Sequence, residues 1–169
     1  MSHKIMKFKI NKKNKSNIFL KGKKIYFKPF EEEDISETYK RDLNDISNLG
    51  INIIFPKNKV ELRSYCKMHK YSHNSILFSI CEVKNNQTIG TTSLSQINWI
   101  NRNAVYGRLI FKEFRNNGYG TECLILLKRY AFNYLNLKSL YTIIFSNNKG
   151  SIKSNIRSGG KICGKLKKH

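Results

Sequence analysis

The chain has 169 residues, 40% of them hydrophobic, with 32 basic and 11 acidic residues and a formal net charge of +21. This length and hydrophobic share exclude a disordered chain and fit one globular domain with a buried core. No apolar run approaches the roughly 20 residues that span a bilayer, and the start lacks the apolar core of a signal peptide, so we expect a cytoplasmic protein with no membrane partner.

The predicted elements follow from hydrophobic periodicity and turn residues. Residues 1–24, rich in Lys and Asn, are expected to form a basic mobile extension, and residues 25–169 the folded domain. In chain order, we predict a strand at 25–30, a helix starting at the acidic run Glu31-Glu32-Glu33-Asp34, a helix at 59–71, strands at 76–83, 88–99 and 104–111, a helix at 121–135, a strand at 140–145, a helix at 149–157 and a strand at 161–166.

The three central strands are joined by short turn-rich segments, which predicts an antiparallel meander. A helix separates strand 104–111 from strand 140–145, so these two are expected to lie parallel through a right-handed crossover. The expected fold class is therefore α/β (α+β), with a central mixed, mostly antiparallel sheet and helices on both faces.

The run Arg115-Asn116-Asn117-Gly118-Tyr119-Gly120 lies between a predicted strand and a predicted helix. Two glycines allow a tight turn, so that backbone N–H groups converge on an anion at the positive end of the following helix. The run lacks the Gly-Lys-Ser/Thr ending of a nucleotide-triphosphate loop and the third glycine of a dinucleotide fingerprint. Taken alone, the run fits two alternatives: a site for another pyrophosphate-bearing cofactor, or an ordinary helix entry that binds no ligand.

The other chemistry-bearing residues are less informative. The four cysteines are scattered without a Cys-x-x-Cys pair, which favours reduced thiols over a zinc site or disulfides. His69 and His73 are spaced to share a helix face, but no adjacent Glu or third ligand accompanies them, so no metal is expected. The lysines are spread along the chain, as AT-rich codon usage produces, although their field still favours anionic acceptors and repels polyamines or aminoglycosides.

The order of elements around this loop resembles the GNAT superfamily of N-acetyltransferases, whose acetyl-CoA loop follows the pattern Gln/Arg-x-x-Gly-x-Gly/Ala. Arg115, Gly118 and Gly120 match it. The resemblance covers about residues 21–168, through Ile25-Tyr-Phe-Lys-Pro-Phe, Gly120-Thr-Glu-Cys-Leu and Asn148-Lys-Gly-Ser151 followed by Gly159. Within this superfamily, the sequence most resembles ribosomal-protein N-terminal acetyltransferases and bacterial amino-sugar N-acetyltransferases.

The resemblance implies acetyl-CoA as the cofactor, with its pyrophosphate on the loop and its pantetheine arm between splayed strands 104–111 and 140–145. The arm would pair with backbone groups of Leu109 and Phe111, and an N–H of Leu109 or Ile110 would stabilise the oxyanion. The implied cofactor-binding residues are Leu109, Ile110, Phe111, Arg115, Asn116, Asn117, Gly118, Tyr119, Gly120, Thr121 and Asn148.

Two catalytic positions depart from the family pattern. Val105 stands where many members have a Glu base, and Asn155 where many have a Tyr that protonates the leaving thiolate. Ser151, which with Asn148 can hold a water near the sulfur, and Glu82, the only carboxylate within the central strands, are the remaining catalytic candidates. For Glu82, a solvent-facing strand end is the alternative role.

The chain stops just after the expected strand 161–166, so the family's last strand is missing from the prediction. Three alternatives are open: a truncated product, a strand borrowed from a second copy in a homodimer, or a cofactor-binding relic without efficient turnover. The leading function is acetyl transfer to a primary amine, on a nucleotide-linked amino sugar or a protein N-terminus. Nucleic-acid binding would need basic residues interleaved with exposed aromatic residues, and is the weaker alternative.

Overall fold

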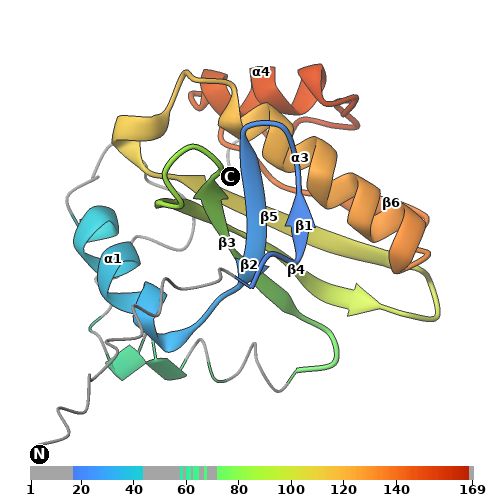
Figure 1. Ribbon diagram of the computed structural model, residues 1–169. Coiled ribbons are helices and arrows are strands. Elements are labelled where there is room, and N and C mark those ends of the chain that lie inside the picture. Colours follow the sequence, from blue (N-terminus) through green and yellow to red (C-terminus); the bar gives the residue numbers. More distant parts are fainter. Residues whose placement is uncertain are drawn as a thin grey trace, which may run out of the picture.

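The computed structural model describes residues 17–43, 58, 60, 61, 63, 64, 67 and 72–167 (Figure 1). Its elements are β1 (Leu20–Lys21), β2 (Ile25–Pro29), α1 (Glu32–Leu43), β3 (Ile76–Glu82), β4 (Thr88–Asn98), β5 (Asn103–Ile110), the 3-10 turn η2 (Lys112–Phe114), α3 (Tyr119–Arg129), the π-helical turn η3 (Tyr130–Tyr134), β6 (Ser139–Tyr141) and α4 (Lys149–Arg157). Most of the predicted helix 59–71 lies outside the described residues.

The six strands form one sheet in the order β1-β2-β3-β4-β5-β6. All neighbours are antiparallel except β5 and β6, which are parallel and pair from Asn103↔Ser139 to Val105↔Tyr141. The predicted meander and the predicted parallel crossover through α3 are confirmed. Because β6 ends at Tyr141 while β5 continues to Ile110, the two strands are paired at one end only, and a gap between them opens beyond Val105.

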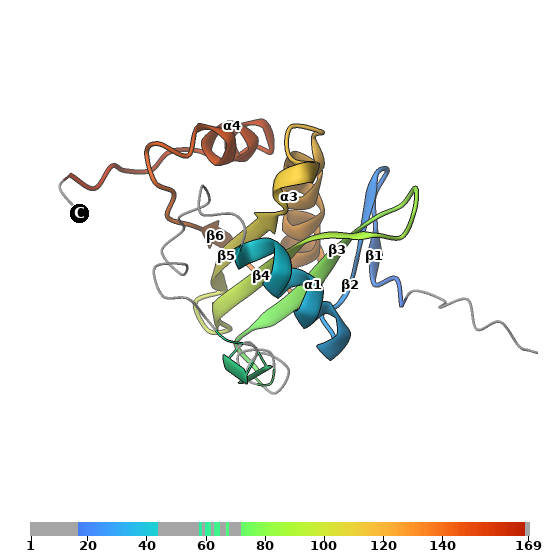
Figure 2. The same cartoon turned by 90° about the vertical axis from the view of Figure 1, so that its left-hand side faces the viewer.

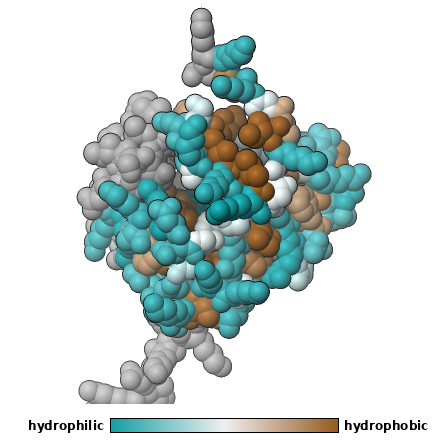
Figure 3. Space-filling model, turned by 90° about the horizontal axis from the view of Figure 1, so that it is seen from above, coloured by the Kyte–Doolittle hydropathy of each residue, from teal (hydrophilic) through white to brown (hydrophobic). Residues whose placement is uncertain are grey.

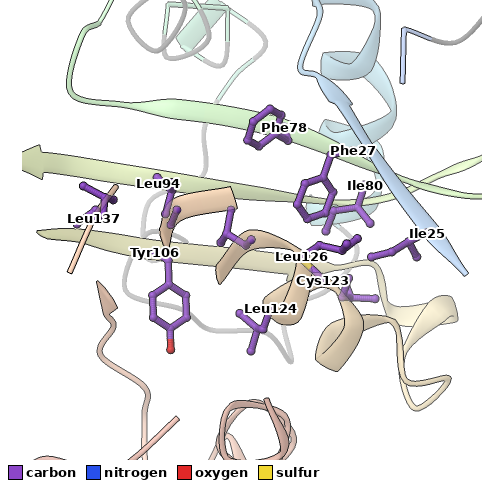
Figure 4. Close-up of a cluster of buried hydrophobic side chains, with 14 of the residues drawn as sticks. Ile25, Phe27, Phe78, Ile80, Leu94, Tyr106, Cys123, Leu124, Leu126 and Leu137 are labelled. Atoms are coloured by element: carbon purple, nitrogen blue, oxygen red, sulfur yellow. The ribbon is translucent and has the colours of Figure 1, made fainter. Parts of the chain in front are cut away.

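Helices cover both faces of this sheet (Figures 1 and 2). On one face, α3 packs its buried apolar side against alternate residues of the strands, and these residues form the main core (Figure 4). Leu124 and Leu127 of α3 and Phe27 and Ile80 of the sheet are each at most 1% exposed. Helix α1 lies over the opposite face. The predicted α/β class with a mixed sheet is therefore confirmed.

A buried carboxylate holds α1 on its face of the sheet. Asp34 is 5% exposed; its Oδ1 lies 2.9 Å from Lys28 Nζ, and its Oδ2 accepts a hydrogen bond from Ser79 Oγ at 2.7 Å. Burial by itself would lower the pKa of Lys28, but the hydrogen bond and charge of Asp34 outweigh it and raise that pKa. The acidic first turn of α1 thus interacts favourably with the helix dipole, and its Asp34 also attaches the helix to the sheet.

At its other end, α1 contacts the segment that follows β5. Arg41 forms an ion pair with Glu113, and its guanidinium lies 5.2 Å from the ring centre of Phe111 and 5.7 Å from that of Phe114. Stacking of a guanidinium on aromatic rings is favourable. The helix therefore supports η2, which leads into the glycine-containing loop.

The two ends of the domain differ from the prediction. Strand β1 lies inside the segment 1–24 assigned to a mobile extension, and the ring of Phe19 stacks on Phe78 with centroids 5.1 Å apart. The expected boundary at residue 24 is therefore too late. Residues 161–166 form no strand; Ile162 is 73% and Leu166 63% exposed. Since β6 already ends at Tyr141, the described sheet offers this segment no long edge on which to pair.

Among the residues described, no helix is both long and apolar enough to cross a membrane. Within the same residues, no group of three or more His, Cys, Asp or Glu side chains is arranged to hold a metal ion. His69, which the sequence pairs with His73, lies outside them.

Cys123 on α3 predicts a loss of stability at high pH. Its side chain is fully buried, and burial raises the pKa of its thiol from 9.0 to about 12. Below pH 9 the thiol is neutral in both the folded and unfolded chain. Above that, only the unfolded chain releases the proton, so this thiol lowers the free energy of unfolding by about 1.4 kcal/mol per pH unit until about pH 12. We expect Cys123→Ala to flatten this slope in urea unfolding, and Cys163→Ala, at an exposed thiol, to leave it unchanged.

Candidate active site

A cavity of about 700 Å³ lies between the loop 115–120 with the start of α3 on one side and α4, along its length, on the other. Its described lining residues are Arg108, Ile110, Phe114, Arg115, Asn116, Gly118, Gly120, Thr121, Asn147, Asn148, Lys149, Gly150, Ser151, Lys153, Ser154 and Arg157. Figure 3 views the molecule from the side of α4 and shows hydrophilic side chains gathered beside a hydrophobic patch. The predicted anion loop therefore forms one wall of a real cavity.

The loop reaches α3 through two left-handed residues. Asn116 has φ 66° and Gly118, the N-cap of α3, has φ 82°. The carbonyl of Gly118 accepts hydrogen bonds from the N–H groups of Thr121 and Glu122, both at 3.1 Å. The first N–H groups of a helix have no intrahelical partner and carry its positive end. This turn therefore presents the start of α3 to the cavity as an anion site.

The charges in the cavity also indicate an anion site. The described lining residues include five cations, Arg108, Arg115, Lys149, Lys153 and Arg157, and no carboxylate. The opposite wall begins at a second helix N-terminus, where the side chain of Asn148 accepts a hydrogen bond from the N–H of Ser151 at 3.0 Å. Cations and helix N-termini together favour a ligand with several negative charges, as phosphates have.

Arg108 is a central site residue that the sequence reasoning missed. Its Nη1 donates to the carbonyl of Gly120 at 2.5 Å and its Nη2 to Ser154 Oγ at 2.9 Å, so it joins the loop wall to the α4 wall. A Cβ atom on Gly120 would lie only 3.2 Å from Nη1. The lack of a side chain at Gly120 therefore leaves room for the guanidinium. Burial lowers the pKa of Arg108, although arginine stays protonated at neutral pH.

Most of the predicted cofactor-binding residues lie in the cavity wall. Ile110, Arg115, Asn116, Gly118, Gly120, Thr121 and Asn148 line it, as does Ser151. Leu109, Phe111, Asn117 and Tyr119 are not among its lining residues. Asn117 instead uses its carbonyl to accept a hydrogen bond from Lys24 Nζ at 3.2 Å, which fixes the outer side of the loop.

The backbone groups that face the β5–β6 gap also differ from those predicted. The N–H of Phe111 donates to the carbonyl of Ile89 in β4 at 3.0 Å. This N–H therefore points toward β4 and away from the gap. In an antiparallel ladder, hydrogen-bonded pairs alternate, and the register Thr91↔Leu109 then directs the N–H and C=O of Leu109 toward β4 as well. By the same alternation, the groups of Tyr106, Arg108 and Ile110 point into the gap. An arm in the gap would therefore meet Ile110 but not Leu109 or Phe111.

Glu82 is not placed to act in this cavity. It is 7% exposed, rather than at a solvent-facing strand end, and its carboxylate accepts a hydrogen bond from the Tyr119 hydroxyl. That hydrogen bond raises the pKa of Tyr119. Since Glu82 lies outside the lining and already has a partner on α3, its place in the fold fits a support for the loop rather than a base.

Asn155 lies near the C-terminal end of α4, the helix whose N-cap is Asn148, and is 8% exposed. Its Oδ1 accepts a hydrogen bond from the Tyr106 hydroxyl, and its Nδ2 donates to the carbonyl of Ser151 at 2.9 Å. Figure 4 shows the Tyr106 ring leaving β5 with its hydroxyl directed at α4. Sequence alternation places Tyr106 and Arg108 on one face of β5, which is the signal that could have found both.

A mixed sheet with a gap between two parallel strands, and a cation-lined cavity at two helix N-termini, define a coenzyme A-dependent acyltransferase. Residues 24–161 match the family described as acetyltransferase (GNAT) domain, and the chain belongs to this family. It is therefore an acetyl-CoA-dependent N-acetyltransferase, and the residues of the cavity fit the phosphates of that cofactor.

Individual relatives agree with this assignment. Spermidine N(1)-acetyltransferase of Escherichia coli K12 is 26% identical over 144 residues, which cover 84% of this chain and 75% of the relative. An acetyltransferase (GNAT family) from Bacillus anthracis has a TM-score of 0.74 at 16% identity and covers 87% and 86% of the two chains. Spermidine N-acetyltransferase from Vibrio cholerae, in complex with CoA and spermine, has a TM-score of 0.70 at 20% identity and covers 80% of each chain. The two structural matches show a shared fold.

Proposed function

We propose that this protein acetylates a primary amine carried by an anionic acceptor, either an amino sugar linked to a nucleotide or a protein N-terminus on the ribosome surface. The observation that supports this choice is the net charge of +21, which attracts anionic molecules and raises their local concentration. Only five of the described cations line the cofactor cavity. The rest of the net positive charge lies outside this cavity, and its field extends to an approaching acceptor.

Bound acetyl-CoA supplies the acetyl group as an activated thioester. The loop N–H groups and the cations of the cavity would hold the phosphates, and the gap beyond Val105 would receive the arm. Gap-facing N–H groups of β5 can then polarise the acetyl carbonyl. A partly neutral amine needs only a water to take its proton. Ser151, which lines the cavity, would hold that water.

A polyamine is the second candidate acceptor, because relatives of this chain are spermidine acetyltransferases. The described chain also has one dense acidic run, and Glu31, Glu32 and Glu33 in it are exposed at the start of α1. A polycation would have to overcome the overall positive field to reach this run. Added salt should therefore lower kcat/KM for an anionic acceptor and raise it for a polyamine.

Release of free thiol from acetyl-CoA, measured with matched amines, tests the proposal. We expect a nucleotide-linked amino sugar or a peptide with acidic residues and a free N-terminus to give the highest kcat/KM, and added salt to lower it. With spermidine we expect a low kcat/KM that rises with salt, because screening removes repulsion. A highest kcat/KM with spermidine would overturn the anionic acceptor and leave acetyl transfer intact, whereas cofactor binding without turnover on any amine would indicate a relic.

A further inference from the structure

The turn between β1 and β2, residues 22–24, lies against the first turn of α3 (Figure 1). The carboxylate of Glu122 accepts two backbone hydrogen bonds there through its Oε1, from the N–H of Lys23 at 2.6 Å and from the N–H of Lys24 at 2.9 Å. Hydrogen bonds to a charged acceptor are stronger than those between neutral groups. Glu122 therefore fastens this turn to the helix that begins at the glycine-containing loop.

The backbone of Lys24 is held from two sides. A Cβ atom at Gly22 would overlap Glu122 Oε1 and lie 2.9 Å from Leu126 Cδ1, so a glycine is needed for the carboxylate to approach the turn. On the sheet side, the carbonyl of Lys24 accepts a hydrogen bond from the N–H of Val83 at 2.9 Å. The side chain of Lys24 therefore starts from a fixed point beside the loop.

The ammonium group of Lys24 sets the direction of one loop peptide. Its Nζ donates to the carbonyl of Asn117 at 3.2 Å. The peptide that joins Asn117 to Gly118 is trans, and the C=O and N–H of a trans peptide point in opposite directions. The N–H of Gly118 therefore points away from Lys24. Gly118 lines the cavity, whereas Asn117 and Lys24 are not among its described lining residues.

This peptide needs to be held because its neighbours give it freedom to turn over. Asn116 and Gly118 are both left-handed, with φ of 66° and 82°, and a glycine crosses between backbone regions at little cost. In the opposite orientation, the Asn117 carbonyl would face the cavity and present a partial negative charge to an anion. Holding the carbonyl outward before a ligand arrives removes that cost from binding.

We propose that Lys24, carried by the turn that Glu122 fastens, is a positioning residue that orients the Asn117–Gly118 peptide toward the pyrophosphate of acetyl-CoA. The proposal rests on the phosphate site of the proposed function and is independent of which amine is the acceptor. It makes the β1–β2 turn part of the cofactor site. Because the orientation acts on phosphates, which are bound equally before and during acetyl transfer, it affects binding of the cofactor and leaves kcat unchanged.

Lys24→Met removes the donor and keeps the length of the side chain. We expect it to raise the calorimetric Kd for acetyl-CoA about 3- to 10-fold, with kcat at saturating cofactor within about twofold. The side chain is exposed, so Tm should stay within about 2 °C of the wild type. Lys24→Arg, which keeps the charge and a donor, should restore most of the affinity.

Lys23→Met is the matched control for the loss of one positive charge in the same turn. The side chain of Lys23 is exposed, and its contact with Glu122 is made by its backbone N–H, which Met retains. Because salt screens an exposed charge, its Kd should stay within about 1.5-fold of the wild type. Equal losses of affinity in Lys23→Met and Lys24→Met would assign the effect to charge and overturn the proposal.

Glu122→Ala separates orientation from charge by the sign of its effect. Removing a negative charge beside the phosphates would by itself raise affinity, whereas releasing the turn that carries Lys24 should lower it about 3-fold or more. The double variant with Lys24→Met should lose little more than the larger single loss, because both changes act through the same peptide. A tighter Kd in Glu122→Ala would overturn the role of the turn.

Gly118→Val, which strains the loop itself, separates this proposal from the one on which it rests. If Gly118→Val loses affinity while Lys24→Met binds acetyl-CoA as tightly as Lys23→Met, the loop is the phosphate site and Lys24 does not position it. If neither Gly118→Val nor Lys24→Met loses affinity, or if the wild type does not bind acetyl-CoA, both proposals are overturned.

Discussion

Gly118→Val is expected to weaken binding of acetyl-CoA by at least about 100-fold. Gly118 has φ 82°, a left-handed conformation that costs a β-branched residue about 1–3 kcal/mol, and it is the N-cap of α3. A Val there either strains the turn or rotates it out of the left-handed region, and rotation redirects the N–H groups that face the cavity. Because several of them act on the same phosphates, their combined loss is larger than the strain alone.

Gly159→Val provides the matched control. Gly159 has φ 86°, and a Cβ there would meet nothing within 4 Å, but it follows the C-terminal end of α4 and is not a lining residue of the cavity. Both variants should lower Tm by a similar amount, and only Gly118→Val should lose affinity in calorimetry. Equal loss of affinity in the two variants would assign the effect to general destabilisation, and retained affinity in Gly118→Val would exclude the loop as the phosphate site.

The loop could be predicted because its conformation is local. Glycine spacing, the strand before it and the helix after it are all read from neighbouring residues, and the structure places Arg115, Gly118 and Gly120 in one cavity wall. The meander and the parallel crossover follow from equally local turn and helix patterns. Where the fold depends on such short-range signals, the sequence is sufficient.

The remainder depends on contacts between distant residues. The strand expected at 161–166 has a suitable alternation but no edge to pair with, whereas β1 forms from two residues because β2 and the ring of Phe78 are close. The place of Glu82 is likewise decided by Tyr119, 37 positions along the chain. Intrinsic strand preference is weak compared with such tertiary contacts, so these features could not be predicted from one segment at a time.

Arg108→Met is expected to lower affinity for acetyl-CoA about 10- to 100-fold. The change removes one cation from the cavity and both hydrogen bonds that join the Gly120 carbonyl to Ser154 across it. A hydrogen bond from a charged donor contributes about 1.5–3 kcal/mol, and each 1.4 kcal/mol of binding energy is a factor of ten. The free energy of unfolding should fall by about 1–3 kcal/mol, because the Gly120 carbonyl is left without its partner.

Two further variants separate the charge of Arg108 from its role as a connection. Arg157 also lines the cavity but is exposed on α4, so Arg157→Met removes a charge and should cost about threefold in affinity with no change in stability. Arg108→Lys keeps the charge but cannot reach two partners in the fixed geometry of a guanidinium, so its affinity should lie between those of the wild type and Arg108→Met. If Arg108→Lys bound acetyl-CoA as tightly as the wild type, the charge alone would be sufficient and the connection between the loop and α4 would carry no binding energy.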